Sequence, residues 1–515
     1  MAAVSLIHRL MRVTIASLLA GFCSLRSGQL WLGLILFALP LMSYPQSGEL
    51  PALRRALERL GQDPDLRPAS WGVAVVDLRS GKLLVSHDPQ RSLATASTMK
   101  AITTATALEI LGPDFRFETR LAYDGNIADS VLTGNLYLIG DGDPTLGSDR
   151  FGPQYEMEAM LNQFVQAVKA AGIKRVQGAV IGDASVFTSQ LVPAKWSWED
   201  MGNYYGAGTA GLNIHENAYR LDFRSGRTGT LTDILRTEPS MDDLIFINEV
   251  IAGPPGSGDQ AYIFGAPYSP QRYVRGSIPP NRASFSIKGS MSDPAQTTAT
   301  WLRQELIDCG IFVNGPATTV RELWAQEGVP MTTRQPLHSF RSPPLAEIAR
   351  ATNFQSVNLF AEALAKRLAV ARRRPGSTEA AVKVMADHWR ARGVNPQGLY
   401  LRDGSGLSPN NGVSALQLAQ ILAKTAEGEA GAAFYASLPT AGREGTLRSM
   451  LQGTAAEGNL RAKSGFISGV RSYAGFVDLP DGRRVAFAMI ANQFACGAGA
   501  MRRKLETLMA ALAEG

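Results

Sequence analysis

A serine and a lysine three positions apart, Ser97 and Lys100 in the run STMK, form the first group of residues able to do chemistry. On a helix this spacing puts both side chains on one face, so they can touch. A serine hydroxyl needs a base to become a nucleophile near neutral pH, and lysine is such a base when its pKa is lowered. Alone the motif is weak, because Ser97 at a helix start can also be a plain N-cap.

Two further motifs lie far downstream of Lys100. Ser356-Val-Asn358 comes directly before an apolar, alanine-rich segment, and Lys463-Ser464-Gly465 lies in a run with strand character. A lysine, a hydroxyl and a glycine on a strand edge are able to bind a carboxylate while the backbone stays open to substrate. Each motif also has an ordinary alternative, namely a capping serine, an exposed lysine or a turn glycine. Together, however, the three follow the order typical of penicillin-recognising serine enzymes.

Longer stretches sharpen this comparison, because the chain resembles the class C low-molecular-mass penicillin-binding proteins, the D-alanyl-D-alanine carboxypeptidase/endopeptidase family. The resemblance covers residues 50–510. Two positions depart from the usual motifs: Val357 stands where Asp is more usual, and Ser464 where Thr is commoner. Neither change removes a needed hydroxyl or amide. The stretches that carry the resemblance are LYLIGDGDPTL at 136–146, EDMGNYYG at 199–206, GLNIHEN at 211–217, RDGSGLS at 402–408 and LPTAGREGTL at 438–447.

The resemblance implies a serine-type D,D-peptidase that acts on peptidoglycan stem peptides and cross-links. Lys100 would deprotonate Ser97, which attacks the carbonyl between two D-alanines and gives an acyl-enzyme. Ser356 would relay a proton to the departing amine near Asn358. β-Lactam inhibitors would acylate Ser97 and leave slowly, because the sequence offers no recognisable deacylating glutamate. Carboxypeptidase and endopeptidase activity are not distinguished.

Substrate binding falls, by the same resemblance, to a second set of residues. Lys463 and Ser464 would hold the terminal carboxylate of the substrate. The backbone N–H of Phe466, which follows Gly465, would form the oxyanion hole together with the N–H of the nucleophile. Asp143 is expected either to contact the stem peptide or to cap the turn before a proline, and the sequence favours neither.

Two other functions stay open at this point. The first is a β-lactamase or esterase that uses the same three motifs, against which the long inserted stretch argues. The second is a non-catalytic envelope scaffold that has kept the fold, against which the intact motif residues argue. The deacylation rate of a penicillin and covalent labelling by a penicillin separate these two functions from a D,D-peptidase.

The elements that must position the motifs follow from hydrophobic periodicity and turn residues. Residues 71–78 and 82–87 predict a hairpin, and the helix at 97–111 begins directly after it. The chain end predicts three strands, the last two joined by a Pro-Asp-Gly turn. Helices are predicted at 50–60, 97–111, 346–368, 378–392 and 498–513, and the three strands at 459–465, 472–478 and 484–492.

These patterns predict an α/β fold with a β-lactamase/transpeptidase-like catalytic domain, in which an antiparallel sheet is flanked by helices beside an all-helical block. Between residues 116 and 341 the sequence pattern changes, and it predicts short strands with frequent Gly, Pro and Asp. This stretch predicts inserted material with its own core, which the resemblance divides into two domains. The predicted division is a catalytic domain at 46–115 and 342–515, a domain II at 116–218 and 284–341, and a domain III at 219–283.

Composition excludes several classes of function. The 515 residues are 45% apolar and 19% charged, which is ordinary for a folded protein. The net charge of +6 is small for this length, so no nucleic-acid partner is expected. The five histidines form no metal-binding pattern, and no cofactor is indicated. The oligomeric state, and whether Cys309 pairs with Cys496, stay open.

The first 45 residues differ from the rest of the chain. A basic start is followed by apolar runs at 13–25 and 30–42, each too short to span a bilayer comfortably. This composition predicts a secretory signal peptide or an N-terminal anchor, and therefore export to the periplasm or cell envelope. Loose or anchored membrane association is left open.

Overall fold

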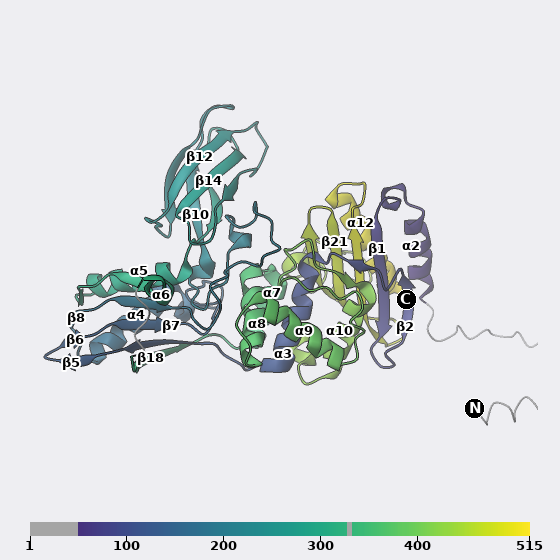
Figure 1. Ribbon diagram of the computed structural model, residues 1–515. Helices are drawn as coiled ribbons and strands as arrows, with labels where there is room; N and C mark the ends of the chain where they lie inside the picture. The colour runs from purple at the N-terminus through teal and green to yellow at the C-terminus, as the bar shows by residue number, and fades with distance from the viewer. Residues whose placement is uncertain (1–49, 327–331) are drawn as a thin grey trace, which may run out of the picture. The chain divides into compact units, whose positions relative to one another are not determined.

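Strands from the two ends of the chain form one antiparallel sheet in the order β2-β1-β22-β21-β20 (Figure 1). The computed structural model describes residues 50–326 and 332–515, so the predicted signal or anchor at 1–45 lies outside the described residues. The predicted antiparallel sheet built from both chain ends is confirmed. Its strands are β1 (Ser70–Asp77), β2 (Leu83–His87), β20 (Arg461–Ile467), β21 (Val470–Asp478) and β22 (Arg484–Asn492).

The two faces of this sheet enter separate hydrophobic cores. On β1, Val73 and Val75 belong to one core, whereas Ala74 and Val76 belong to the other. Neighbouring side chains of a strand point to opposite faces, so a strand buried on both sides must be apolar throughout. The first core is closed by the helices of the two chain ends, which are α2 (Pro51–Gly61) and α12 (Ala498–Glu514).

The second core lies between the sheet and a block of helices. Helix α3 runs through this block with every side chain from Met99 to Leu108 buried, which explains its content of small alanine and threonine residues. The short strands β3 (Ser92–Leu93) and β19 (Val413–Ser414) pair at its border. The block consists of α3 (Met99–Leu111), α7 (Leu345–Gln355), α8 (Asn358–Ala371), α9 (Thr378–Ala391), α10 (Ala415–Glu427) and α11 (Gly431–Ala436).

The single helix predicted over 346–368 is wrong, because the structure has two helices there. Helix α7 ends at Gln355, and Ser356 adopts a left-handed backbone with φ of +60° before α8 begins at Asn358. A left-handed residue cannot continue a right-handed helix. Apolar periodicity runs across the break because both helices are buried against the same core, so periodicity alone does not detect it.

The inserted segment contains a second five-stranded sheet, in the order β17-β9-β7-β4-β18. Helices α4 and α5 contribute Phe164, Val168 and Leu302 to its core. The elements are β4 (Glu118–Tyr123), β7 (Leu136–Ile139), β9 (Val180–Asp183), β17 (Ala317–Thr319), β18 (Gln335–Arg341), α4 (Met157–Ala170), α5 (Pro294–Asp308) and α6 (Val320–Gln326). A smaller sheet has the order β16-β8-β6-β5, formed by Phe312–Val313, Arg175–Val176, Val131–Thr133 and Asn126–Ala128.

Two three-stranded sheets complete the insertion. The first has the order β11-β10-β15, from Asp233–Glu238, Ala218–Arg224 and Phe285–Ser290. The second has the order β12-β14-β13, from Ile245–Ala252, Gln271–Ile278 and Tyr262–Phe264. Strand β15 pairs with β10, so the boundary predicted between residues 283 and 284 separates two strands of one sheet. The division of the insertion into domains II and III stays a prediction.

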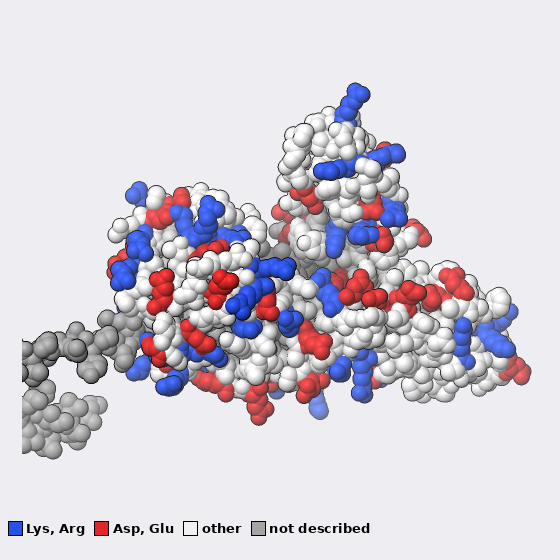
Figure 2. Space-filling view, turned by 180° about the vertical axis from the view of Figure 1, so that it is seen from behind, with Lys and Arg blue, Asp and Glu red and all other residues white. Residues whose placement is uncertain are grey.

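Charged side chains of both signs are interspersed on the face shown in Figure 2. Interspersed charges produce a weak long-range field, unlike the single-sign surface that steers polyelectrolytes. Within residues 50–326 and 332–515, no helix is long and apolar enough to cross a membrane.

Candidate active site

Ser97 lies in a short 3₁₀ turn, η2 (Ala96–Thr98), that leads directly into α3. Ser472 Oγ of strand β21 donates a hydrogen bond of 2.5 Å to the carbonyl of Thr95 and so ties the turn to the sheet. Ala96 has a φ of +46°, a left-handed conformation that is strained in a residue with a Cβ. The sheet therefore holds a strained turn that leaves the Ser97 side chain partly exposed.

The buried Nζ of Lys100 lies within hydrogen-bond distance of three oxygens, Ser97 Oγ at 2.9 Å, Asn358 Oδ1 at 2.6 Å and Ser405 O at 2.8 Å. The amide of Asn358 is oriented by its own NH₂ group, which donates to Tyr205 O at 2.7 Å. Carbonyl oxygens only accept hydrogen bonds. A neutral lysine amine has two N–H bonds and one lone pair, so the two carbonyls take the N–H bonds. In this neutral form the remaining lone pair is left to accept the hydrogen bond of the Ser97 hydroxyl.

Burial sets the protonation of this amine. Burial lowers the pKa of Lys100 from 10.5 to about 7, although the negative charges of Asp403 and Glu362 raise it in part. A lysine with such a pKa is available as a neutral base near pH 7. The geometry and the charge state of Lys100 both suit proton transfer from Ser97.

A second buried lysine, Lys463, contacts the serine of the second motif. Lys463 Nζ donates to Ser356 Oγ at 3.0 Å, and the left-handed backbone of Ser356 places this hydroxyl between α7 and α8. Burial lowers the pKa of Lys463 far below its usual range, and the positive charge of Lys100 lowers it further. The three predicted motifs therefore meet in space, with the pairs Ser97–Lys100, Lys100–Asn358 and Ser356–Lys463 in contact.

Strand β20, at the edge of the sheet, passes directly beside the turn of Ser97. A Cβ added to Gly465 would lie 3.0 Å from Ser97 N and 2.7 Å from Thr95 O. Ser464 Oγ donates to Thr446 Oγ1 at 2.8 Å, so two hydroxyls stand together on this strand edge. The backbone of β20 therefore runs next to the nucleophile, and only a glycine permits so close an approach.

Replacing Gly465 with alanine is expected to slow acylation of Ser97 by about 10²-fold, because misplacing reacting groups by about 1 Å has effects of this size. The added methyl group would also lie 2.2 Å from Ser472 Oγ, so β20 must move away from the turn. Overpacking of this kind costs about 1–3 kcal/mol of stability. Stopped-flow acylation by a chromogenic β-lactam measures the rate, and urea unfolding measures the stability.

Gly61→Ala is the matched control, because no atom lies within 4 Å of a Cβ at Gly61. It should leave the acylation rate unchanged. An acylation rate of Gly465→Ala equal to that of the unaltered protein would show that β20 does not set the geometry at Ser97.

Two buried carboxylates support the loop that carries the carbonyl of Ser405. Glu362 on α8 accepts hydrogen bonds from Gly404 N at 3.0 Å and Ser405 N at 2.8 Å. Asp403 accepts from Gly406 N, Ser408 N, Asn411 Nδ2 and Trp196 Nε1, at 2.7 to 2.9 Å. Because Ser405 O accepts from Lys100, these carboxylates fix one of the three contacts that orient the amine.

Replacing Glu362 with alanine is expected to lower the free energy of unfolding by about 3–5 kcal/mol, because two buried backbone N–H groups lose their acceptor. Glu362→Gln keeps one acceptor oxygen and should lose less. Burial raises the pKa of Glu362 from 4.5 to about 7, and the charge of Asp403 raises it too. Between these values the folded state binds more protons than the unfolded state, so stability falls as pH rises.

The stability difference between the Glu362→Gln variant and the unaltered protein should therefore shift in favour of the variant from pH 5 to pH 8. Urea unfolding at both pH values measures it. A difference that does not change with pH would mean that Glu362 is already ionised at pH 5 in the folded protein.

The inserted segment contributes to the active site through residues 190–209, by backbone carbonyls and by the indole of Trp196. Asn358 donates to Tyr205 O, and Trp196 donates to Asp403 at 2.9 Å. Lys366, buried on α8, donates to the carbonyls of Gln190 at 2.8 Å and Thr209 at 2.9 Å. The insertion is thus part of the structure that orients Lys100.

Asp143 is buried and shows the turn-capping geometry. Its Oδ1 accepts from the backbone N and the hydroxyl of Thr145, at 2.8 and 2.7 Å. Only 1% of the residue is exposed, and burial raises the pKa of its carboxyl to about 6. In this conformation the side chain does not present an open surface to a stem peptide. Contact with substrate stays a prediction that would require the turn to open.

Metal-binding geometry is not seen within the described ranges, where no three His, Cys, Asp or Glu residues are placed to hold an ion. Cys309 and Cys496 are both free thiols. The pairing that the sequence left open is therefore not formed.

Comparison with known proteins decides the family. Residues 53–514 match the D-Ala-D-Ala carboxypeptidase 3 (S13) family. The chain belongs to this family. A D-alanyl-D-alanine carboxypeptidase of Actinomadura sp. strain R39 is 30% identical over 473 residues, which cover 89% of this chain and 84% of that protein. The D-alanyl-D-alanine carboxypeptidase DacB of Haemophilus influenzae is 25% identical over 431 residues, 83% of this chain and 86% of that protein.

Solved structures agree on the fold. The crystal structure of penicillin binding protein 4 (dacB) from Haemophilus influenzae superposes with a TM-score of 0.75. The superposition covers 89% of this chain and 98% of the chain in that crystal structure, and the two sequences are 23% identical. The family and the fold class predicted from the sequence are both confirmed, and the chain is a member of a serine-type D-Ala-D-Ala carboxypeptidase family.

Several site residues were not predicted from the sequence. Asp403 and Thr446 lie in stretches that carry the family resemblance, and Glu362 lies four positions after Asn358, yet no role followed from their spacing. Tyr205 and Ser405 act through backbone carbonyls, which no residue type reveals. The available signal was the stretch RDGSGLS at 402–408, whose acidic residue and glycines indicate a tight, buried turn.

Proposed function

We propose that this chain is an exported, penicillin-sensitive D-Ala-D-Ala carboxypeptidase of the cell envelope, with Ser97 as its nucleophile. The observation that carries the proposal is the buried amine of Lys100, which lies 2.9 Å from Ser97 Oγ and contacts the carbonyls of Asn358 and Ser405. Relatives over most of the chain are named D-alanyl-D-alanine carboxypeptidases, which supports the substrate class.

Acylation follows from this geometry. Lys100 takes the hydroxyl proton as Ser97 Oγ forms a bond to the carbonyl carbon between the two D-alanines. Negative charge on the carbonyl oxygen is stabilised by the backbone N–H groups of Ser97 and Phe466. The C–N bond then breaks, and the departing D-alanine amine takes a proton from Ser356. Ser356 relays the proton that Lys100 removed from Ser97, so it ends the step as a neutral hydroxyl in contact with Lys463. Water completes the cycle by hydrolysing the Ser97 ester.

The terminal carboxylate of the substrate is assigned to the edge of β20. Ser464 and Thr446 place two hydroxyls 2.8 Å apart there, and both are able to donate to a carboxylate. Lys463 lies next in the strand, and an arriving carboxylate would favour its charged form. This arrangement suits a substrate that ends in D-alanine.

Penicillin sensitivity rests on the absence of a suitable deacylating base among the described acidic residues near Lys100. Glu362 and Asp403 are the carboxylates whose charges act on Lys100, and both are buried acceptors of backbone N–H groups. Neither is free to activate a water molecule at the ester. The acyl-enzyme formed by a β-lactam should therefore persist, which argues against a β-lactamase.

Incubation with labelled penicillin followed by peptide mass mapping tests the proposal. The label is expected on the peptide that contains Ser97, and a D-Ala-D-Ala stem peptide should release D-alanine. Label on any other residue, or no label at all, would overturn the mechanism. A purified cross-linked muropeptide then separates endopeptidase from carboxypeptidase activity.

A further inference from the structure

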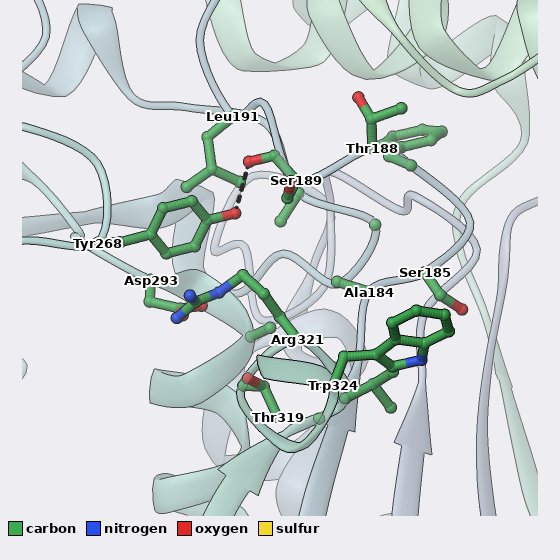
Figure 3. Close-up of a pocket in the computed structure, with 16 residues that line it drawn as sticks. Ala184, Ser185, Thr188, Ser189, Leu191, Tyr268, Asp293, Thr319, Arg321 and Trp324 are labelled. Atoms are coloured by element: carbon green, nitrogen blue, oxygen red, sulfur yellow. Dashed lines mark hydrogen bonds and ion pairs between the residues drawn. The ribbon is translucent and has the colours of Figure 1, made fainter. Parts of the chain in front are cut away.

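A cavity of about 300 Å³ opens in the inserted segment, between residues 182–191 and helix α6 (Figure 3). None of the proposed catalytic or substrate-binding residues lines it. We propose that this cavity is a second binding site, for an N-acetylated sugar unit of the peptidoglycan glycan strand. The proposal rests on the proposed function, because the polymer that carries the stem peptides also carries these sugars.

The charges in the cavity favour a neutral ligand. Arg321 forms an ion pair with Asp293 at 3.0 Å, and its guanidinium lies 4.0 Å from the centre of the Tyr268 ring. Figure 3 shows these three side chains grouped at one wall. Because the positive charge is already balanced, a carboxylate or phosphate gains little by entering. A neutral polar ligand fits this wall better than the charged end of a stem peptide.

Polar atoms without partners indicate where such a ligand would bind. Among the residues that the structure describes, Arg321 Nε and Thr188 Oγ1 are buried and have no hydrogen-bond partner. A buried polar group without a hydrogen-bond partner costs free energy, so such a group indicates a place where a ligand or a water molecule binds. Both residues line the same cavity, and both can donate to a neutral oxygen, such as an acetamido carbonyl or a sugar hydroxyl.

The remaining walls suit the apolar parts of a sugar. Trp324 is 72% exposed, and Figure 3 shows its indole among the side chains that line the cavity. An exposed indole offers a flat apolar face with a polar edge, which matches the C–H face of a pyranose ring. Ala184, Ala210 and Ala295 form small apolar walls that leave room for the methyl group of an acetamide.

The size of the cavity selects a single unit. A volume of about 300 Å³ is at the lower end of the range for small-molecule sites. It accommodates one sugar unit with its acetamide, but not a cross-linked peptide. Lys366 of α8 donates to the carbonyls of Gln190 and Thr209, next to the cavity-lining Leu191 and Ala210. A bound strand would therefore be held by a wall tied to the helix that starts at Asn358.

Calorimetric titration of the full chain with tetra-N-acetylchitotetraose tests the site. Saturable binding is expected, weakened at least tenfold in Trp324→Ala. Trp198→Ala is the matched control, because Trp198 is 56% exposed but packs on Phe264 outside the cavity, and it should bind as the unaltered protein does. No saturable binding, equal binding by Trp324→Ala, or displacement of the sugar by N-acetyl-D-Ala-D-Ala would each overturn the proposal.

Kinetics separate failure of this site from failure of the proposed function. With purified cell-wall sacculi as substrate, Trp324→Ala should raise KM about fivefold or more and leave kcat unchanged. With a short D-Ala-D-Ala peptide, kcat/KM should not change, because that substrate carries no sugar. An unchanged KM on sacculi overturns the second site, whereas inactivity of the unaltered protein on the short peptide overturns the proposed function.

Discussion

Replacing Ser97 with alanine is expected to lower the rate of D-Ala-D-Ala hydrolysis by about 10⁴- to 10⁶-fold, the loss typical of removing a catalytic nucleophile. The variant loses one oxygen atom, while Lys100 keeps its hydrogen bonds to Asn358 and Ser405. The fold should therefore stay intact, and the thermal midpoint should change by only a few degrees. Covalent labelling by a fluorescent penicillin should disappear, since the nucleophilic Oγ is gone.

Ser468→Ala provides the matched serine-to-alanine control. Ser468 is exposed in the turn directly after β20, close in sequence to the third motif. Its replacement should leave both hydrolysis and labelling at the level of the unaltered protein. Persistent labelling of the Ser97→Ala variant would assign the acyl-enzyme to another hydroxyl, of which Ser356 would be the first to examine.

The sequence predicts the local part of this site well, because helix geometry alone brings Ser97 and Lys100 together across three positions. Strand periodicity likewise places the third motif on β20. The long-range part follows only from the family resemblance. Lys100 and Asn358 are 258 positions apart, and no periodicity predicts their 2.6 Å contact. Such contacts depend on how the sheet and the helical block pack, which local patterns do not encode.

Prediction from sequence fails most clearly where backbone conformation or a backbone carbonyl, and not a side chain, positions the catalytic residues. The left-handed Ser356 breaks a helix that apolar periodicity predicts as continuous. The carbonyls of Ser405 and Tyr205 position Lys100 and Asn358, yet any residue type carries a carbonyl. For Asp143 the sequence left a turn cap and a substrate contact equally open, and the structure shows the turn-capping geometry with the side chain buried. Tertiary context decides each case.

Replacing Lys100 with methionine is expected to slow acylation by about 10²- to 10⁴-fold, the range for loss of a general base. In the unaltered protein the acylation rate should rise about tenfold per pH unit at acidic pH and level off above a pKa of about 7. The sign follows from the lone pair, because a protonated ammonium cannot accept the Ser97 proton. The methionine variant should lack this rise. Stopped-flow acylation by a chromogenic β-lactam from pH 5 to pH 9 measures both effects.

The rival assignment is Lys463, whose pKa is also lowered by burial. Its Nζ contacts Ser356 rather than Ser97, so a base at Lys463 would have to act through that hydroxyl. Lys463→Met should weaken binding but keep the rise with pH, since Lys100 still titrates. A rise that survives in Lys100→Met and vanishes in Lys463→Met would reverse the assignment. The two sites are linked, because the charge of Lys100 lowers the pKa of Lys463. Removing Lys100 should therefore raise the pKa of Lys463. Any pH dependence of acylation that remains in Lys100→Met should move to higher pH, which would identify Lys463 as its source.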